Sequence, residues 1–256
     1  MSDHDLDDSF DDDYLYFYEA AQLPERSERE AAFIGRTLAL TQGQRLLDAP
    51  CGYGRIANHA AQQGLRVVGV DRSEVLLAHA RSSAHSLEPS VRPTFVSLDL
   101  RNMNSSDVGG VFDGAVCWFS SFGYHTEDEN YRILENLHST LVARGRLLLE
   151  VLNRDALKST LSLDRSMLVL ASERGRDAIM DRIRLAEGEE GLQVDRLICR
   201  GDVIRRSAIA IRAYSFDEIM ASLRAVGFAD VRQVELQDSE ADLVTKWALV
   251  VIATKV

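Results

Sequence analysis

The stretch LLDAPCGYGRI, residues 46–56, decides the fold of this chain. An apolar run ends on the acidic residue Asp48, a turn with Gly52 and Gly54 follows, and a helical pattern begins at Arg55. Glycine lets the backbone turn sharply and approach a ligand with no Cβ atom in the way. The stretch therefore predicts a β-strand, a tight loop and an α-helix in direct succession.

A second acidic residue, Asp71, lies nineteen residues after Gly52, where the apolar run over residues 65–70 ends. In an open parallel sheet, ligands bind where strands end and helices begin, and a carboxylate about 20 residues beyond such a loop can bind the hydroxyl pair of a ribose. The two features predict a site for a cofactor that contains a nucleoside. Residues 52–57 also fit a loose G-x-G-x-x-A dinucleotide pattern, which alone is a weak signal.

Asp48 distinguishes between the two kinds of nucleoside cofactor. A dinucleotide places its pyrophosphate at the helix N-terminus after the first strand, where a carboxylate would repel it. A ligand with a cationic ammonium group and no phosphate suits Asp48, and S-adenosylmethionine (SAM) has both properties. Residues 47–54 resemble motif I of class I SAM-dependent methyltransferases, and Asp71 matches the acidic residue after their second strand.

The rest of the chain alternates between strand and helix patterns, which predicts a parallel sheet with right-handed crossovers. Strands are expected at residues 45–49, 65–70, 94–98, 112–118, 146–152, 231–236 and 246–253, with helices at 27–41, 55–62, from Ser73, at 127–142, at 154–163 and from the capping box of Ser215 and Glu218. The resemblance implies an α/β, Rossmann-like, seven-stranded and mostly parallel sheet. Its last strand is antiparallel and helices cover both faces.

Four segments are expected: a leader and helical cap at residues 1–40, a cofactor-binding core at 41–152, a flap at 153–214, and a helix with a final strand pair at 215–256. The flap is expected because its strand patterns are short and punctuated by glycines, which indicates an antiparallel insertion over the carboxyl edge of the sheet. Within the leader, residues 1–13 are acidic, and we expect them to be disordered or loosely held.

Composition and charge favour a small-molecule enzyme of the cytoplasm. The net charge of −11 opposes binding to a phosphate backbone, and the nucleic-acid amino-methyltransferase signature is absent after the fourth strand. The three cysteines are scattered, without the spacing of a metal site or a disulfide framework. The acidic N-terminus is the opposite of a signal peptide, and no apolar run reaches membrane-spanning length. We expect a small-molecule acceptor, no metal, and no nucleic acid or membrane partner. A homo-oligomer is compatible with the sequence.

The resemblance also assigns cofactor contacts. Asp99 and Leu100 follow the third strand and would bind adenine N6 and N1, although Asp99 could instead only cap a turn. Arg55 could either cap the helix in solvent or reach the cofactor carboxylate. The expected cofactor-binding residues are Tyr14, Tyr18, Asp48, Ala49, Pro50, Gly52, Arg55, Asp71, Arg72, Asp99, Leu100 and Phe119.

The acceptor is expected at residues 120–125, which follow the fourth strand. This segment is similar to that of small-molecule methyltransferases, including amino-sugar and antibiotic N-methyltransferases. His125 is the one plausible base there, or else a surface histidine at a helix start. Phe122 and Tyr16 are expected beside the reacting groups, and the three tyrosines at 14, 16 and 18 could hold a cation or anchor the N-terminus.

The favoured hypothesis is a SAM-dependent methyltransferase that acts on an amine of a small metabolite, in secondary-metabolite or antibiotic biosynthesis. An O-methyltransferase with His125 as base is the first alternative. A nicotinamide-dependent (NAD) oxidoreductase and a SAM-binding protein without catalysis are alternatives of other classes. Asp48 weighs against the oxidoreductase.

Overall fold

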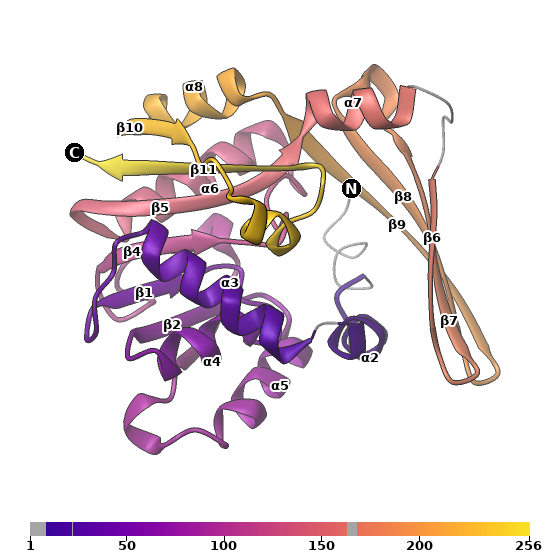
Figure 1. Cartoon of the computed structure of the whole chain (residues 1–256), viewed down its shortest axis with the longest axis horizontal. Helices are drawn as coiled ribbons and strands as arrows, with labels where there is room; N and C mark the ends of the chain where they lie inside the picture. Colours follow the sequence, from indigo (N-terminus) through magenta and orange to yellow (C-terminus); the bar gives the residue numbers. More distant parts are fainter. Residues whose placement is uncertain (1–8, 22, 163–167) are drawn as a thin grey trace.

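The computed structural model describes residues 9–21, 23–162 and 168–256. Within them, seven strands form the central sheet in the spatial order β3-β2-β1-β4-β5-β11-β10 (Figure 1). Their bounds are β1 Arg45–Asp48, β2 Arg66–Asp71, β3 Thr94–Ser97, β4 Phe112–Cys117, β5 Leu141–Asn153, β10 Phe228–Gln233 and β11 Ala248–Lys255. Strands β1 to β5 pair in parallel, and β11 runs antiparallel to both β5 and β10. The expected sheet is confirmed.

Helices cover both faces of this sheet. Helices α3 (Pro24–Thr37) and α4 (Arg55–Gln62) pack on one face, with α5 (Glu74–Ala84) beside α4. Helices α6 (Glu127–Ser139) and α8 (Phe216–Val226) pack on the other face. Along β5, Leu147 and Leu149 point to the α6 side and Leu148 points to the α3 side, as the period-2 alternation of a strand requires.

Local sequence signals begin and end these helices. Thr126 and Ser215 each form a complete capping box, at the starts of α6 and α8. Ser73 caps α5 by accepting the Leu76 N–H. Gly54 adopts φ +78° before α4, and a Cβ atom there would lie 2.7 Å from Cβ of Ala80, so the loop requires glycine.

The antiparallel insertion follows α7 (Arg154–Ser162) and forms a four-stranded meander, here called the flap sheet. It consists of β6 (Leu168–Arg174), β7 (Asp177–Leu185), β8 (Gly191–Arg200) and β9 (Val203–Tyr214). The last two residues of β9 pair in parallel with Leu152 and Asn153 of β5. The flap sheet is thus hydrogen-bonded to the carboxyl end of β5 and extends away from the core (Figure 1).

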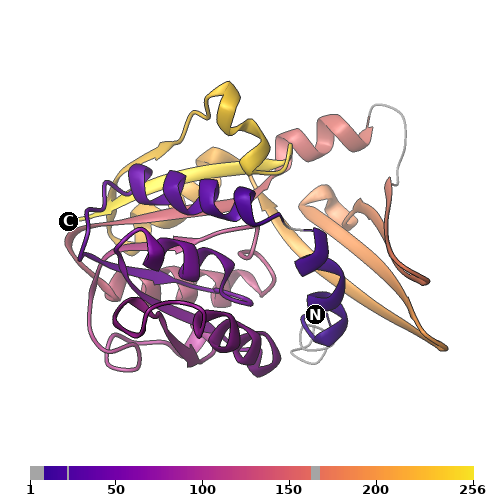
Figure 2. The same cartoon turned by 60° about the horizontal axis from the view of Figure 1, so that its bottom comes forward.

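Helix α2 (Asp12–Ala21) lies between the flap sheet and α5, as both views show (Figures 1 and 2). Its Tyr18 hydroxyl accepts a hydrogen bond from Arg196, whose guanidinium pairs with Asp181 at 2.7 Å. Asp13 pairs with Arg200 at 2.8 Å, and Ser9 is buried. The expectation of a loosely held leader is therefore wrong for residues 9–13, because arginines of the flap sheet bind its carboxylates; residues 1–8 lie outside the described residues.

Several expected boundaries also need correction. The helix expected to reach residue 142 ends at Ser139, because β5 already pairs with β4 from Leu141. The strand expected at 231–236 begins at Phe228, directly after Gly227 ends α8 in the left-handed conformation. The end of the helix expected at residue 163 falls outside the described residues, and α7 is described to Ser162. No described helix is long and apolar enough to cross a membrane.

We expect Asp181→Ala to destabilise the protein by about 3–5 kcal/mol, because it leaves the buried Arg196 guanidinium without its anion. The side chains of Asp181 and Arg196 are only 12% and 5% exposed. Asp195→Ala, which breaks the exposed pair with Arg182, should cost less than about 1 kcal/mol. Urea denaturation of the three proteins measures both values, and equal losses would contradict the assignment.

Candidate functional site

A cavity lies at the carboxyl ends of β1, β2, β3 and β4, where the N-terminal segment covers it. Its wall comes from the loops after these strands, from α6 and from the N-terminal segment. The lining residues are Phe10, Tyr14, Pro50, Gly52, Asp71, Arg72, Ser73, Leu76, Leu98, Asp99, Leu100, Cys117, Ser121, Phe122, Gly123, Tyr124, His125, Asn130 and Ile133. The loops of several strands meet here because parallel strands end at one edge of the sheet.

Asp71 shapes the loop between β1 and α4. Its carboxylate accepts the Gly52 N–H at 2.8 Å and the Ser73 N–H at 2.9 Å, so it joins the glycine loop to the end of β2. Burial raises the pKa of Asp71, and these backbone hydrogen bonds act in the opposite direction. Each carboxylate oxygen keeps a second lone pair, with which it can accept a ligand hydroxyl.

Asp48 and Arg55 are buried charged groups that do not line this cavity, although their charges act on Asp71 and Tyr14, which do. Within the described residues, Asp48 Oδ2, Arg55 Nη2 and the Tyr53 hydroxyl are buried without a hydrogen-bond partner. Burial raises the pKa of Asp48 to about 7, although the Arg55 charge lowers it. A buried polar atom without a partner is costly, so these atoms suit a ligand that carries both an ammonium group and a carboxylate.

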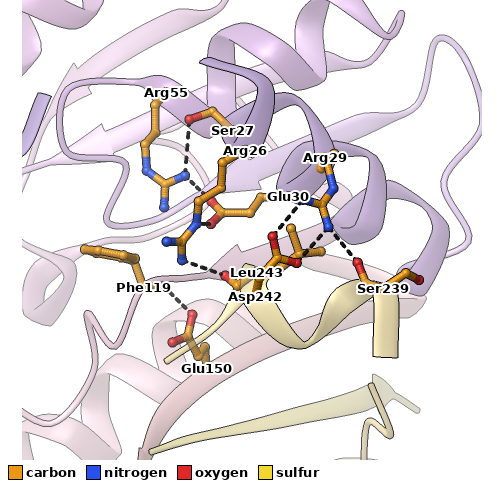
Figure 3. Close-up of polar contacts among 10 residues, drawn as sticks. All are labelled: Arg26, Ser27, Arg29, Glu30, Arg55, Phe119, Glu150, Ser239, Asp242 and Leu243. Carbon is orange, nitrogen blue, oxygen red and sulfur yellow. Dashed lines mark hydrogen bonds and ion pairs between the residues drawn. The ribbon is translucent and has the colours of Figure 1, made fainter. Parts of the chain in front are cut away.

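Arg55 is held by a buried ion pair with Glu30 of α3, whose side chain is fully buried (Figure 3). Arg26 pairs with the same carboxylate at 2.8 Å and donates to the Leu243 carbonyl at 3.1 Å. The guanidinium of Arg55 also lies 5.0 Å from the ring centroid of Phe119. The alternative in which Arg55 caps the helix in solvent is wrong, since its side chain is 11% exposed.

Asp99 lines the cavity and also caps a turn. It accepts the Arg101 N–H at 2.9 Å and pairs with the Arg101 guanidinium, which also binds Glu129 at 2.7 Å. Although burial acts to raise it, the hydrogen bonds from Arg101 lower the pKa of Asp99. The carboxylate is therefore held ionised at the cavity wall, next to Leu100.

The tyrosines of the N-terminus separate because α2 is a helix. Tyr14 and Tyr18 lie one helical turn apart and stack at 4.4 Å, with Tyr14 in the cavity wall. Tyr16 points to the flap sheet instead, where Arg174 and Arg200 lie over its ring. Tyr18 contacts the Arg196–Asp181 pair. The structure thus brings Tyr14 to the cavity and places Tyr16 and Tyr18 on the flap side.

His125 and Phe122 both line the cavity, and Phe122 packs on Tyr214 at 5.6 Å between ring centroids. The His125 carbonyl accepts a hydrogen bond from the side-chain amide of Asn130, which fixes this loop to the start of α6.

Ala49 is fully buried in the core. Arg154, the first residue of α7, pairs with Glu218 of α8 at 2.7 Å. Among the described residues, no group of His, Cys, Asp and Glu side chains could hold a metal.

Four functional candidates were missed by sequence reasoning. Phe10 enters the wall because its carbonyl accepts the Ser73 hydroxyl at 2.9 Å and its ring contacts Tyr14 and Tyr124. Glu30, Asn130 and Glu150 are buried polar side chains on regular elements. The signal for Glu150 was an acidic residue within the otherwise apolar run of residues 147–152, whereas Glu30 ends the charged run at residues 25–30 and gives no such signal.

Comparisons with known proteins agree with this geometry. Residues 46–145 match the model of the methyltransferase domain family. The chain is 31% identical over 114 residues to a putative methyltransferase, YqeM, of Bacillus subtilis (strain 168). The aligned residues make up 44% of each protein. The chain thus spans about half the length, or less, of the curated relatives it matches.

Solved structures are similar over almost the whole chain. The CcbJ methyltransferase from Streptomyces caelestis has a TM-score of 0.72 at 18% identity, covering 98% of this chain and 96% of that one. CalS10, an amino pentose methyltransferase from Micromonospora echinaspora, has a TM-score of 0.64 at 20% identity, covering 93% and 96%. At these identities the likeness establishes the fold, including the insertion.

We expect Asp48→Asn to stabilise the ligand-free protein at pH 8 by about 2–4 kcal/mol and to change its stability little at pH 4. The folded-state pKa of Asp48, about 7, lies above that of the unfolded chain. The folded wild type therefore binds the proton more tightly and loses stability as the pH rises from about 4 to 7.

Urea denaturation at pH 4, 6 and 8 measures this difference. Asp202→Asn, at an exposed position in the turn between β8 and β9, is the matched control and should follow the wild type at every pH. An Asp48→Asn protein with the pH profile of the wild type would contradict the prediction.

Proposed function

We propose that this chain, which carries a class I SAM-dependent methyltransferase domain, transfers a methyl group from SAM to an amine of a small metabolite. The observation that carries the proposal is the set of unpartnered buried atoms on Asp48 and Arg55 beside the glycine loop. Asp48 suits the ammonium group and Arg55 the carboxylate of an amino-acid moiety. Asp71 suits the ribose, and Asp99 with Leu100 suits the adenine.

A nicotinamide dinucleotide fits these residues poorly. Asp48 is fully buried at the end of β1, and the cost of its ionisation would rise further beside a pyrophosphate. Arg55 sits on the first turn of α4, but Glu30 already neutralises one side of its guanidinium. SAM supplies an electrophilic methyl group when bound, and the residues of this chain need only orient it and exclude water.

Several features support an amine as the acceptor. Phe10, Tyr14, Phe122 and Tyr124 give the cavity an aromatic wall, and aromatic faces attract ammonium groups. An amine in its free-base form carries its own lone pair, so positioning and desolvation can supply most of the catalysis. By analogy with CalS10, we place the acceptor among amino-sugar-like secondary metabolites, which includes precursors of antibiotics.

The alternatives are separated by two assays. Calorimetric titration with SAM, S-adenosylhomocysteine (SAH) and NAD distinguishes a methyltransferase site from a dinucleotide site. Formation of SAH is then measured with matched acceptors, an amino sugar and the same sugar with a hydroxyl in place of the amine. Turnover of the amine alone supports the proposal, turnover of the hydroxyl favours the O-methyltransferase, and SAM binding without turnover of a broad panel favours a non-catalytic protein.

Asp71→Ala should weaken SAM binding about tenfold to a hundredfold, because charge-assisted hydrogen bonds to the ribose contribute about 1.5–3 kcal/mol. Since Asp71 also holds Gly52 and Ser73, the folded fraction is checked by circular dichroism. Asp202→Ala serves as the exposed control. Unchanged SAM affinity in a folded Asp71→Ala protein removes Asp71 from the site.

His125→Ala should reduce turnover of an amine acceptor only slightly, and activity should rise with pH as the amine loses its proton. If the acceptor is a hydroxyl, loss of a true general base should lower turnover by roughly 10²–10⁴. The pH–rate profiles of wild type and variant decide between them. A thousandfold loss, with a wild-type inflection in the histidine range, would refute the amine.

A further inference from the structure

The chain leaves β4 through a backbone turn that ordinary residues rarely adopt. Phe119 has φ +63° and Ser120 has φ +52°, so two consecutive residues with side chains are left-handed. Such conformations are unfavourable for L-residues other than glycine and persist only where the surroundings hold them. The turn leads directly into residues 121–125, which line the cavity.

Glu150 of β5 holds this turn. Its Oε2 accepts the Phe119 N–H at 2.7 Å (Figure 3). Its Oε1 accepts the Ser120 hydroxyl at 3.2 Å, so both left-handed residues bind one carboxyl group. The side chain is buried, with Glu150 1% exposed. Its two hydrogen bonds match the two strained residues one to one.

The far end of the segment is fixed by the flap sheet. The Gly123 carbonyl accepts the Arg212 N–H at 2.8 Å, and a Cβ atom on Gly123 would lie 2.7 Å from the Arg212 carbonyl oxygen. Residues 119–123 are therefore hydrogen-bonded to β5 at one end and to β9 at the other. Glu150 forms the hydrogen bonds at the β5 end.

Glu150 occupies a costly position for a carboxyl group. It forms no ion pair with any described residue. Burial raises its pKa to about 7, although the hydrogen bonds from Phe119 and Ser120 and the more distant Arg55 charge lower it. A buried carboxyl that gains no counter-ion must contribute in another way, since an apolar side chain would fill the β5 position without this cost. The hydrogen bonds to the turn are what an apolar residue could not supply.

We propose that Glu150 is a positioning residue, which holds the left-handed turn at Phe119 and Ser120 and so places the cavity wall at residues 121–125. The inference rests on the proposed function only in treating that wall as part of the cofactor and acceptor site. It requires the length and acceptor oxygens of the side chain rather than its charge.

Two variants distinguish the effect of the side-chain length of Glu150 from the effect of its charge. Glu150→Gln keeps the reach and one carbonyl acceptor but removes the charge, whereas Glu150→Asp keeps the charge and shortens the side chain by one methylene. Hydrogen exchange of the ligand-free protein should be about tenfold faster over residues 119–125 in Glu150→Asp, because a hydrogen bond to the turn is lost, and close to wild type in Glu150→Gln. Exchange over α8 is the internal control, since general destabilisation would accelerate it as well.

Two further variants test the strain itself, in the Glu150→Asp background. Ser120→Gly and Ser120→Ala remove the same hydroxyl, but only glycine adopts φ +52° without cost. Slow exchange should return with Ser120→Gly and not with Ser120→Ala. SAH affinity, measured by calorimetry, should fall about tenfold in Glu150→Asp and recover with Ser120→Gly, since the turn sets the cavity wall.

Three results would overturn the inference. If exchange over residues 119–125 is as fast in Glu150→Gln as in Glu150→Asp, the charge of Glu150 is needed. Equal exchange in the glycine and alanine variants would show that strain is not what Glu150 opposes. SAH affinity unchanged in a loosened Glu150→Asp protein would separate the turn from the cavity wall. Failure of the wild type to bind SAH would instead refute the proposed function, while the exchange experiments would still test Glu150.

Discussion

A buried ion pair between two helices connects the parts of the site. The Glu30 carboxylate, which no solvent reaches, holds the Arg55 guanidinium where it faces Asp48 and contacts the Phe119 ring. A buried charge is tolerable only with a partner, so loss of Glu30 would leave the Arg55 guanidinium without its anion, whereas Glu30 itself also pairs with Arg26. Because Arg26 extends the pair to the Leu243 carbonyl, α3 near the N-terminus and the segment before β11 meet at this point (Figure 3). The helix that precedes β1 in sequence, α3, therefore holds Arg55 at the site that we propose for the cofactor.

The features predictable from the sequence are those that depend on local pattern. The glycine loop at residues 52–54 and the alternation of strands and helices gave the core, because parallel connectivity leaves few arrangements. The same connectivity explains why Asp71 and Asp99, far apart in sequence, were expected at one edge and are found there. Boundaries were less predictable: residues 140–142 fit a helix by composition, and pairing with β4 draws Leu141 into a strand instead.

Features that depend on distant partners could not be predicted. Phe10 looked like one more residue of an acidic leader, and only the Ser73 hydroxyl and the Tyr124 ring bring it to the cavity. Tyr16 was expected beside the reacting groups, but its place on α2 turns it to Arg174 and Arg200 of the flap sheet, while Tyr14 of the stacked Tyr14–Tyr18 pair lines the cavity. Glu150 reads as an interruption in an apolar strand until the turn after β4 is known.

Helix α2 is attached more closely to the flap sheet than to the core. Helix α2 packs on the flap sheet through the cluster of Phe17, Ile179 and Ile198. Its Tyr18 also binds the Arg196–Asp181 pair of that sheet. The flap sheet is in turn anchored to β5 by strand pairing. With the core, the N-terminal segment makes the Ser73–Phe10 hydrogen bond and the partly exposed His79–Glu19 pair. We therefore expect α2 to stay with the flap sheet, which is itself paired with β5, if α2 and α5 separate.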